Sequence, residues 1–126
     1  MVSSQEHIQI AYESFNGAEA CFINKTSPRG INTAKSLCLA VEHAIKSMIV
    51  KETGEDSPNG HNLNYFVNTY LNHIDFGKHK DIIHSMDGMY TATRYDPDIV
   101  IEDLADKMTK VEKFLEFARR KIESKH

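Results

Sequence analysis

The sequence has little cysteine and no long apolar run. Only Cys21 and Cys38 occur among its 126 residues, and both fall on apolar helical faces, which is typical of reduced core residues. No stretch approaches the roughly 20 apolar residues that span a bilayer, and the first residues lack the basic and apolar regions of a signal peptide. These absences argue against a disulfide framework and a membrane-spanning protein, and they predict a cytoplasmic location.

An excess of positive charge is also lacking. The formal net charge is -3 and the pI is about 6.1, so the chain has no global basic field of the kind that marks many nucleic-acid-binding domains. The charge is nevertheless uneven, because residues 107–126 carry seven basic side chains against three acidic ones. Such a stripe is compatible with a phosphate backbone or an acidic partner, but the favoured interpretation is a solvated helix face whose cations complement the helix dipole.

The motifs of several enzyme classes are absent. The sequence has no Walker phosphate loop, no Gly-x-Gly-x-x-Gly fingerprint and no Gly-x-Ser-x-Gly elbow, so nothing local favours an NTPase, a dinucleotide enzyme or a hydrolase. Seven histidines raise the question of a metal site. However, no His-x-x-x-His or Cys-x-x-Cys spacing occurs, and His79 and His84 stand five apart, off a common helical face. We therefore expect no bound metal and no cofactor.

The three prolines are informative because of what precedes them. They occur in the pairs Ser27-Pro28, Ser57-Pro58 and Asp96-Pro97. Serine and aspartate accept hydrogen bonds from free backbone N–H groups at a helix start, and proline at the first helical position loses no hydrogen bond. Each pair therefore predicts the start of a helix.

Apolar residues recur at intervals of three and four along most of the chain, which predicts helices rather than strands. The expected helices cover about 5–24, 29–51, 79–93 and 98–122, and a shorter third helix follows the polar loop 52–60, with apolar residues from Leu63 to Ile74 and Gly77 as its stop. Short connections between long amphipathic helices favour antiparallel neighbours. The predicted fold is all-α: a single domain over residues 1–126, built as an antiparallel up-down bundle of four to five helices, with the two short helices on one side.

Two groups of polar residues are candidates for a site. Glu42 and Lys46 stand four apart within an almost apolar stretch, which is compatible with a charge pair facing a cleft and with an ordinary surface pair. Arg94 and Tyr95 lie where the fourth and fifth expected helices join, and His61 opens the third. Arginine grips phosphate, tyrosine stacks on bases and histidine moves protons near neutral pH, so these residues could form a nucleotide or RNA phosphate site. Helix capping and packing explain them as well, and spacing alone favours that explanation.

With these residues in view, the sequence resembles the HEPN family of small helical bundles. The matching features are Ala40-Val-Glu42-His-Ala-Ile-Lys46, a polar loop that ends at His61-Asn-Leu63, and a helix that leaves through Tyr90-x-x-x-Arg94-Tyr95 towards a proline. The resemblance implies an association with nucleotides or RNA, with Glu42, Lys46, His61, Arg94 and Tyr95 as the positions to test. It also implies a homodimer and, for some members, a nucleotidyltransferase partner in toxin-antitoxin or defence systems. Other members are metal-independent ribonucleases.

The sequence departs from the ribonuclease branch of the family. That branch has an arginine followed about four to six residues later by a histidine, a pairing suited to acid-base cleavage. No histidine follows Arg94 until His126, and only Arg119 or Arg120 with His126 matches formally, at the chain end. Asp96 also adds a negative charge beside the expected phosphate grip.

These departures favour a non-catalytic module that binds a nucleotide or a nucleotidyltransferase partner. Two alternatives remain at this stage. One is a divergent ribonuclease assembled as a dimer from Arg94 and either His61 or His84, and the other is a purely structural interaction bundle.

Overall fold

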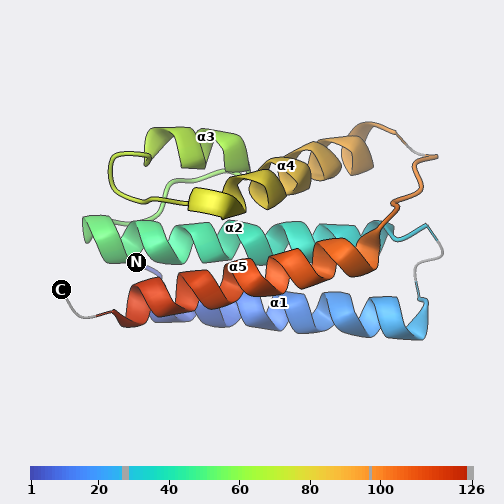
Figure 1. The fold of residues 1–126 in the computed structure, drawn as a ribbon, viewed down its shortest axis with the longest axis horizontal. Coiled ribbons are helices and arrows are strands. Elements are labelled where there is room, and N and C mark those ends of the chain that lie inside the picture. The colour runs from blue at the N-terminus through green and yellow to red at the C-terminus, as the bar shows by residue number, and fades with distance from the viewer. Residues whose placement is uncertain (27–28, 97, 125–126) are drawn as a thin grey trace.

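The computed structural model describes residues 1–26, 29–96 and 98–124, and within these ranges it contains helices and no strand. The elements follow in the order α1 (Ser4–Asn24), α2 (Ile31–Thr53), α3 (Leu63–Thr69), η1 (Gly77–His79), α4 (Lys80–Tyr95) and α5 (Leu104–Glu123), where η1 is one 3-10 turn. The long helices α1, α2, α4 and α5 alternate in direction, and α3 lies beside α4 above α2 (Figure 1). The predicted all-α up-down bundle is confirmed.

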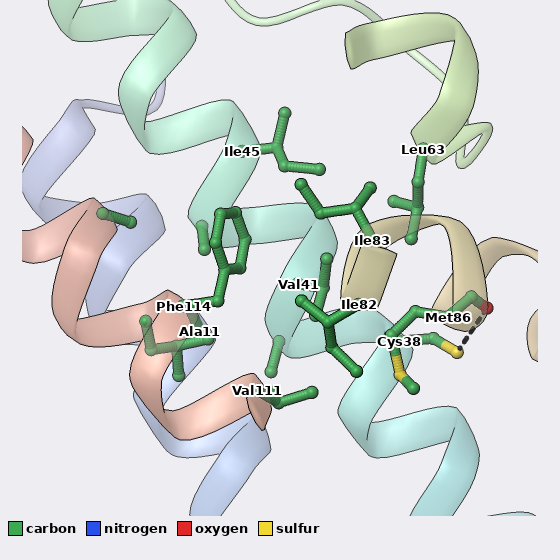
Figure 2. Close-up of a cluster of buried hydrophobic side chains, with 14 of the residues drawn as sticks. Ala11, Cys38, Val41, Ile45, Leu63, Ile82, Ile83, Met86, Val111 and Phe114 are labelled. Atoms are coloured by element: carbon green, nitrogen blue, oxygen red, sulfur yellow. Dashed lines mark hydrogen bonds between the residues drawn. The ribbon is translucent and has the colours of Figure 1, made fainter. Parts of the chain in front are cut away.

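The α2 helix is the centre of the bundle. It lies between α1 and α5 on one side and α3 and α4 on the other (Figure 1), and most of its residues from Leu37 to Val50 are buried. A helix that is apolar on nearly every face is stable only when it is covered all round. Figure 2 shows the result: Phe114 of α5 and Ile82 of α4 reach the same core that Val41 supplies from α2.

The two cysteines are free thiols, as predicted. Cys38 is buried in the core and donates from its Sγ to the carbonyl oxygen of Met86 at 3.3 Å (Figure 2), whereas Cys21 is only half-buried. Burial raises the pKa of the Cys38 thiol to about 12, so this sulfur stays protonated at neutral pH and acts as a packing group. None of the described helices is long and apolar enough to cross a membrane.

The helix start predicted at Ser57-Pro58 is wrong. Helix α3 begins at Leu63, five residues beyond Pro58, and the side chain of Asn62 caps it by accepting from the Tyr65 N–H at 2.9 Å. The Ser57 hydroxyl does not cap a helix, because it is hydrogen-bonded to Nε2 of His7 at 3.2 Å. The hydroxyl group that was expected to cap a helix therefore forms a hydrogen bond with a residue of α1 instead.

The other two pairs lie partly or wholly outside the described residues. Neither Ser27 nor Pro28 is described, and α2 begins at Ile31 after Gly30. Pro97 is also outside, and α5 begins only at Leu104. Here the Asp96 carboxylate accepts from the Asp98 N–H at 3.1 Å, which closes a local turn instead of starting a helix.

The third helix is shorter than expected. It ends at Thr69, and Gly77 begins η1 instead of ending α3. The chain between them is irregular, yet Ile74 and Phe76 are buried in the core. The apolar residues whose spacing predicted a longer helix are therefore buried from a loop. The Asp75 carboxylate stabilises the turn there by accepting from the Gly77 N–H at 2.9 Å.

The segment before α5 packs on the turn between α1 and α2. The Ile101 N–H donates to the Arg29 carbonyl at 3.0 Å. Gly30 has a φ of +74°, and a Cβ at this position would lie 2.6 Å from Cδ1 of Leu104. The left-handed backbone conformation therefore favours glycine here, and a larger residue would also have to displace the side chain of Leu104.

Candidate functional site

Glu42 is the most buried charged residue of the candidate site. Only 5% of it is exposed, and its Oε2 lies 3.2 Å from Nζ of Lys46, one turn further along α2. Its Oε1 lies 2.6 Å from Nδ1 of His61. Lys46 is itself buried, with its Nζ 5.6 Å from the centre of the Phe66 ring. The pair that spacing suggested is therefore present, but it lies inside the protein rather than on a solvated face.

The segment that follows His61 is tied to α4. It lies just before Asn62, the cap of α3, and the Asp87 carboxylate of α4 accepts from the Leu63 N–H at 3.0 Å and from Nδ2 of Asn64 at 2.8 Å. Asp87 thus ties the start of α3 to α4. The side chain of His61 is 58% exposed, so a buried carboxylate orients an imidazole that faces solvent.

Aromatic and basic residues of α4 extend the series of contacts beyond His61. The rings of His61 and Tyr90 are 6.1 Å apart, and Cζ of Arg94 lies 5.6 Å from the centre of the Tyr90 ring and 5.6 Å from that of Tyr95. Tyr95 is 74% exposed, and Arg94 is exposed beside it. Among residues 1–26, 29–96 and 98–124, no carboxylate forms an ion pair with Arg94, and Asp96 is engaged in its own turn.

These contacts form one continuous chain of side chains, which we call the polar row. It consists of Lys46, Glu42, His61, Tyr90, Arg94 and Tyr95, in order of contact. A cavity of about 140 Å³ beside it is lined in part by Leu39, Glu42, His61 and Tyr90. The structure thus brings all five predicted residues together and adds Tyr90, whose spacing of four from Arg94 was the available signal.

The contact with Glu42 fixes the chemistry of the His61 ring. A carboxylate oxygen accepts hydrogen bonds, so Nδ1 of His61 carries the proton in this pair. In the neutral imidazole, Nε2 is then an acceptor on an exposed ring. His84, the other histidine considered, is exposed on α4 ten residues before Arg94, about 15 Å away along the helix axis. Within the described residues, no cluster of three His, Cys, Asp or Glu side chains could hold a metal ion.

A second set of polar side chains, which we call the histidine network, adjoins the polar row and was not predicted. Nδ1 of His7 lies 3.0 Å from Nδ1 of His43, and their rings are stacked with centres 5.2 Å apart. Nε2 of His7 contacts the Ser57 hydroxyl, and Nε2 of His43 lies 3.9 Å from Oε2 of Glu42. Residues distant in sequence meet here, so no local spacing could have revealed the network.

The histidine network makes stability sensitive to acid. Burial lowers the pKa of both His7 and His43, and their mutual repulsion lowers that of His7 further. Because the unfolded chain then binds more protons than the folded one, stability is complete above the ordinary histidine pKa of about 6.5 and decreases as the pH falls below it. We expect urea unfolding to show a lower free energy of unfolding at pH 5 than at pH 7.5.

Two variants locate this effect. His7→Leu removes one partner of the Nδ1 pair and should flatten the pH dependence, whereas His84→Gln, at an exposed position, should leave it unchanged. A residual slope is expected, since burial also lowers the pKa of His79. An identical slope in His7→Leu and the unmodified protein would show that the network is not the acid-sensitive element.

Comparison with known proteins gives one match. The family model of the HEPN domain matches residues 4–124, nearly the whole chain. No curated protein and no solved structure matches this chain. The match confirms the resemblance drawn from the motifs around Glu42, His61 and Arg94.

Proposed function

This chain belongs to the HEPN family, whose helical domains are associated with nucleotides and RNA, and we propose that it binds a nucleotide at the exposed end of the polar row. Arg94 would grip a phosphate, the Tyr90 and Tyr95 rings would contact the base or the sugar, and Nε2 of His61 would accept a hydrogen bond from a hydroxyl or amino group of the ligand. The buried Glu42 and Lys46 position His61 in this proposal and do not contact the ligand.

The observation that carries the proposal is the environment of the Arg94 side chain. Its guanidinium is exposed, lies against two tyrosine rings and has no carboxylate partner within the described parts of the chain. An exposed guanidinium without a carboxylate partner can form a bidentate, charge-assisted contact with phosphate. Asp96 accepts from the Asp98 N–H at 3.1 Å, and within the described parts of the chain it forms no ion pair with Arg94.

Calorimetry with AMP, ADP and ATP tests the proposal. We expect Arg94→Ala to weaken the binding of the preferred nucleotide by at least about tenfold, because it removes a charge-assisted hydrogen bond worth roughly 1.5–3 kcal/mol. Arg119→Ala is a matched control, since Arg119 also lies over a tyrosine ring, that of Tyr12 at 5.9 Å, but on α5. Affinity in this control should stay within about twofold.

The proposal fails if no nucleotide binds and no partner protein co-purifies with the chain. Co-purification matters because we also propose a nucleotidyltransferase partner of the toxin-antitoxin or defence type, and a homodimer, on the basis of the family resemblance. Light scattering of the purified chain tests the homodimer independently of any ligand.

A second candidate function is metal-independent RNA cleavage. The observation that favours it is the Glu42–His61 pair, which leaves Nε2 of an exposed imidazole available to move a proton on the same row as Arg94. Cleavage that persists in chelator and is lost in both His61→Ala and Arg94→Ala would select this function. Cleavage unchanged in both variants would point to a contaminating nuclease.

A further inference from the structure

A second concave site lies at the opposite end of α4 from Arg94. Residues of η1 and the start of α4 face α5 across a cavity of about 340 Å³. Lys80, the first residue of α4, and Arg94 are separated by about 20 Å along the helix axis at 1.5 Å per residue. The cavity is therefore distinct from the polar row, and its size falls within the usual range of small-molecule sites, about 300–1,000 Å³.

Lysine dominates this lining, so we call it the lysine cavity. Four lysines line it: Lys78 from η1, and Lys107, Lys110 and Lys113 from α5. They stand at every third position on α5, and this is where part of the basic stripe in residues 107–126 comes to lie. This part of the basic stripe is therefore not only a solvated helix face, because it lines a cavity together with Lys78 of η1.

The carboxylates present do not neutralise these lysines. Asp106 forms an exposed ion pair with Lys110 at 3.0 Å, and Asp81 also lines the cavity. Two carboxylates against four ammonium groups leave a positive balance of two charges. Nζ of Lys107 donates to the Glu102 carbonyl at 3.1 Å.

Lys78 and Lys113 differ from the other two lysines. The ammonium group of neither lysine forms an ion pair or a hydrogen bond with another of the described residues, and both side chains are exposed. Their three N–H donors each are therefore available to an anion in the cavity.

We propose that the lysine cavity binds a small phosphorylated ligand carrying at least two negative charges, gripped by Lys78 and Lys113. Lysine is a common phosphate binder that acts as a point charge, and a dianion would balance the excess of two positive charges. A single-stranded RNA is less well matched, because such sites pair a basic groove with aromatic rings on which bases stack. The one aromatic side chain in the lining, His79, already packs on Phe117 with ring centres 4.7 Å apart.

The test uses inorganic pyrophosphate and ADP as probes of the full chain in calorimetry at low salt. We expect both to bind, and Lys78→Gln/Lys113→Gln to weaken the affinity for pyrophosphate at least about tenfold. Lys51→Gln/Arg120→Gln removes the same charge from exposed positions outside the cavity and should change the affinity less than about twofold. Equal losses in the two double variants would overturn the proposal, because they would reflect net charge alone.

The location is tested by the ring of His79. Burial and the neighbouring Lys78 lower the pKa of this imidazole, and an anion bound beside Lys78 would offset that repulsion. The histidine signals in an NMR titration should therefore show the pKa of His79 rising when pyrophosphate saturates the protein. No change in that pKa would overturn the assignment of the site.

Two further outcomes separate this inference from the proposed function. Arg94→Ala should retain pyrophosphate binding, because Arg94 lies at the other end of α4. If Arg94→Ala abolished that binding while the lysine variant retained it, the lysine cavity would be excluded and the polar row supported. Binding of an RNA oligonucleotide without binding of either small probe would overturn the proposal in favour of a polymeric ligand.

Discussion

Replacing Glu42 by leucine should lower the free energy of unfolding by about 3 kcal/mol. The carboxylate is 6% exposed and pairs with Lys46 at 3.2 Å and with His61 at 2.6 Å. Its removal leaves the Lys46 ammonium buried without a counter-charge, and a buried unpaired charge is strongly destabilising. Chemical denaturation at pH 7.5, where the histidine network is intact, gives the value directly.

The double variant Glu42→Leu/Lys46→Met identifies the cause of that loss. If the cost arises from the stranded ammonium, removing both charges should recover most of the stability, since a well-packed apolar pair often replaces a buried ion pair without loss. A double variant as unstable as Glu42→Leu would instead assign the cost to His61 and the loop that it anchors.

The exposed pair of Asp106 and Lys110 provides the matched comparison. It has the same spacing of four on a helix, with an N–O distance of 3.0 Å, but its side chains are 63% and 59% exposed. Exposed pairs contribute roughly 0.2–1 kcal/mol, so Asp106→Asn should reduce stability by less than about 1 kcal/mol. The contrast between two pairs of equal spacing would measure what burial adds.

The sequence predicts the helices better than it predicts where they begin. The recurrence of apolar residues at three and four predicts the helices because it reflects the buried faces directly. The pairs Ser57-Pro58 and Asp96-Pro97 misled because Ser-Pro and Asp-Pro suit a turn as well as a helix start. The choice between the two was made by contacts such as that of Ser57 with His7, which lies 50 residues away in sequence.

The candidate site was predictable where its contacts are local. Glu42 with Lys46 and Tyr90 with Arg94 follow from the spacing of four on a helix, and the structure shows both pairs in contact. The burial of Glu42 and the approach of His61 depend on how α3 is tied to α4 through Asp87, which lies 24 residues from Leu63. Such contacts between elements are set by packing, and spacing within one helix does not report them.

The core prediction with the largest effect concerns Phe114. This side chain of α5 is fully buried and faces the residues that α1, α2 and α4 contribute to the core (Figure 2). Phe114→Ala removes most of a ring from a site that four helices enclose, so little collapse can fill the cavity. We expect a loss of about 4 kcal/mol in the free energy of unfolding.

Phe117 distinguishes a loss of packing from a loss of aromatic contact. It lies on the same helix, and its ring is closer to His79 than that of Phe114, with centre distances of 4.7 Å and 5.6 Å. Phe117 is only partly buried, so Phe117→Ala should cost about 1–2 kcal/mol. Phe114→Leu should cost less than Phe114→Ala, because leucine retains much of the volume. If the two alanine variants were equally unstable, contact with His79 rather than enclosure by the four helices would determine the contribution of these rings.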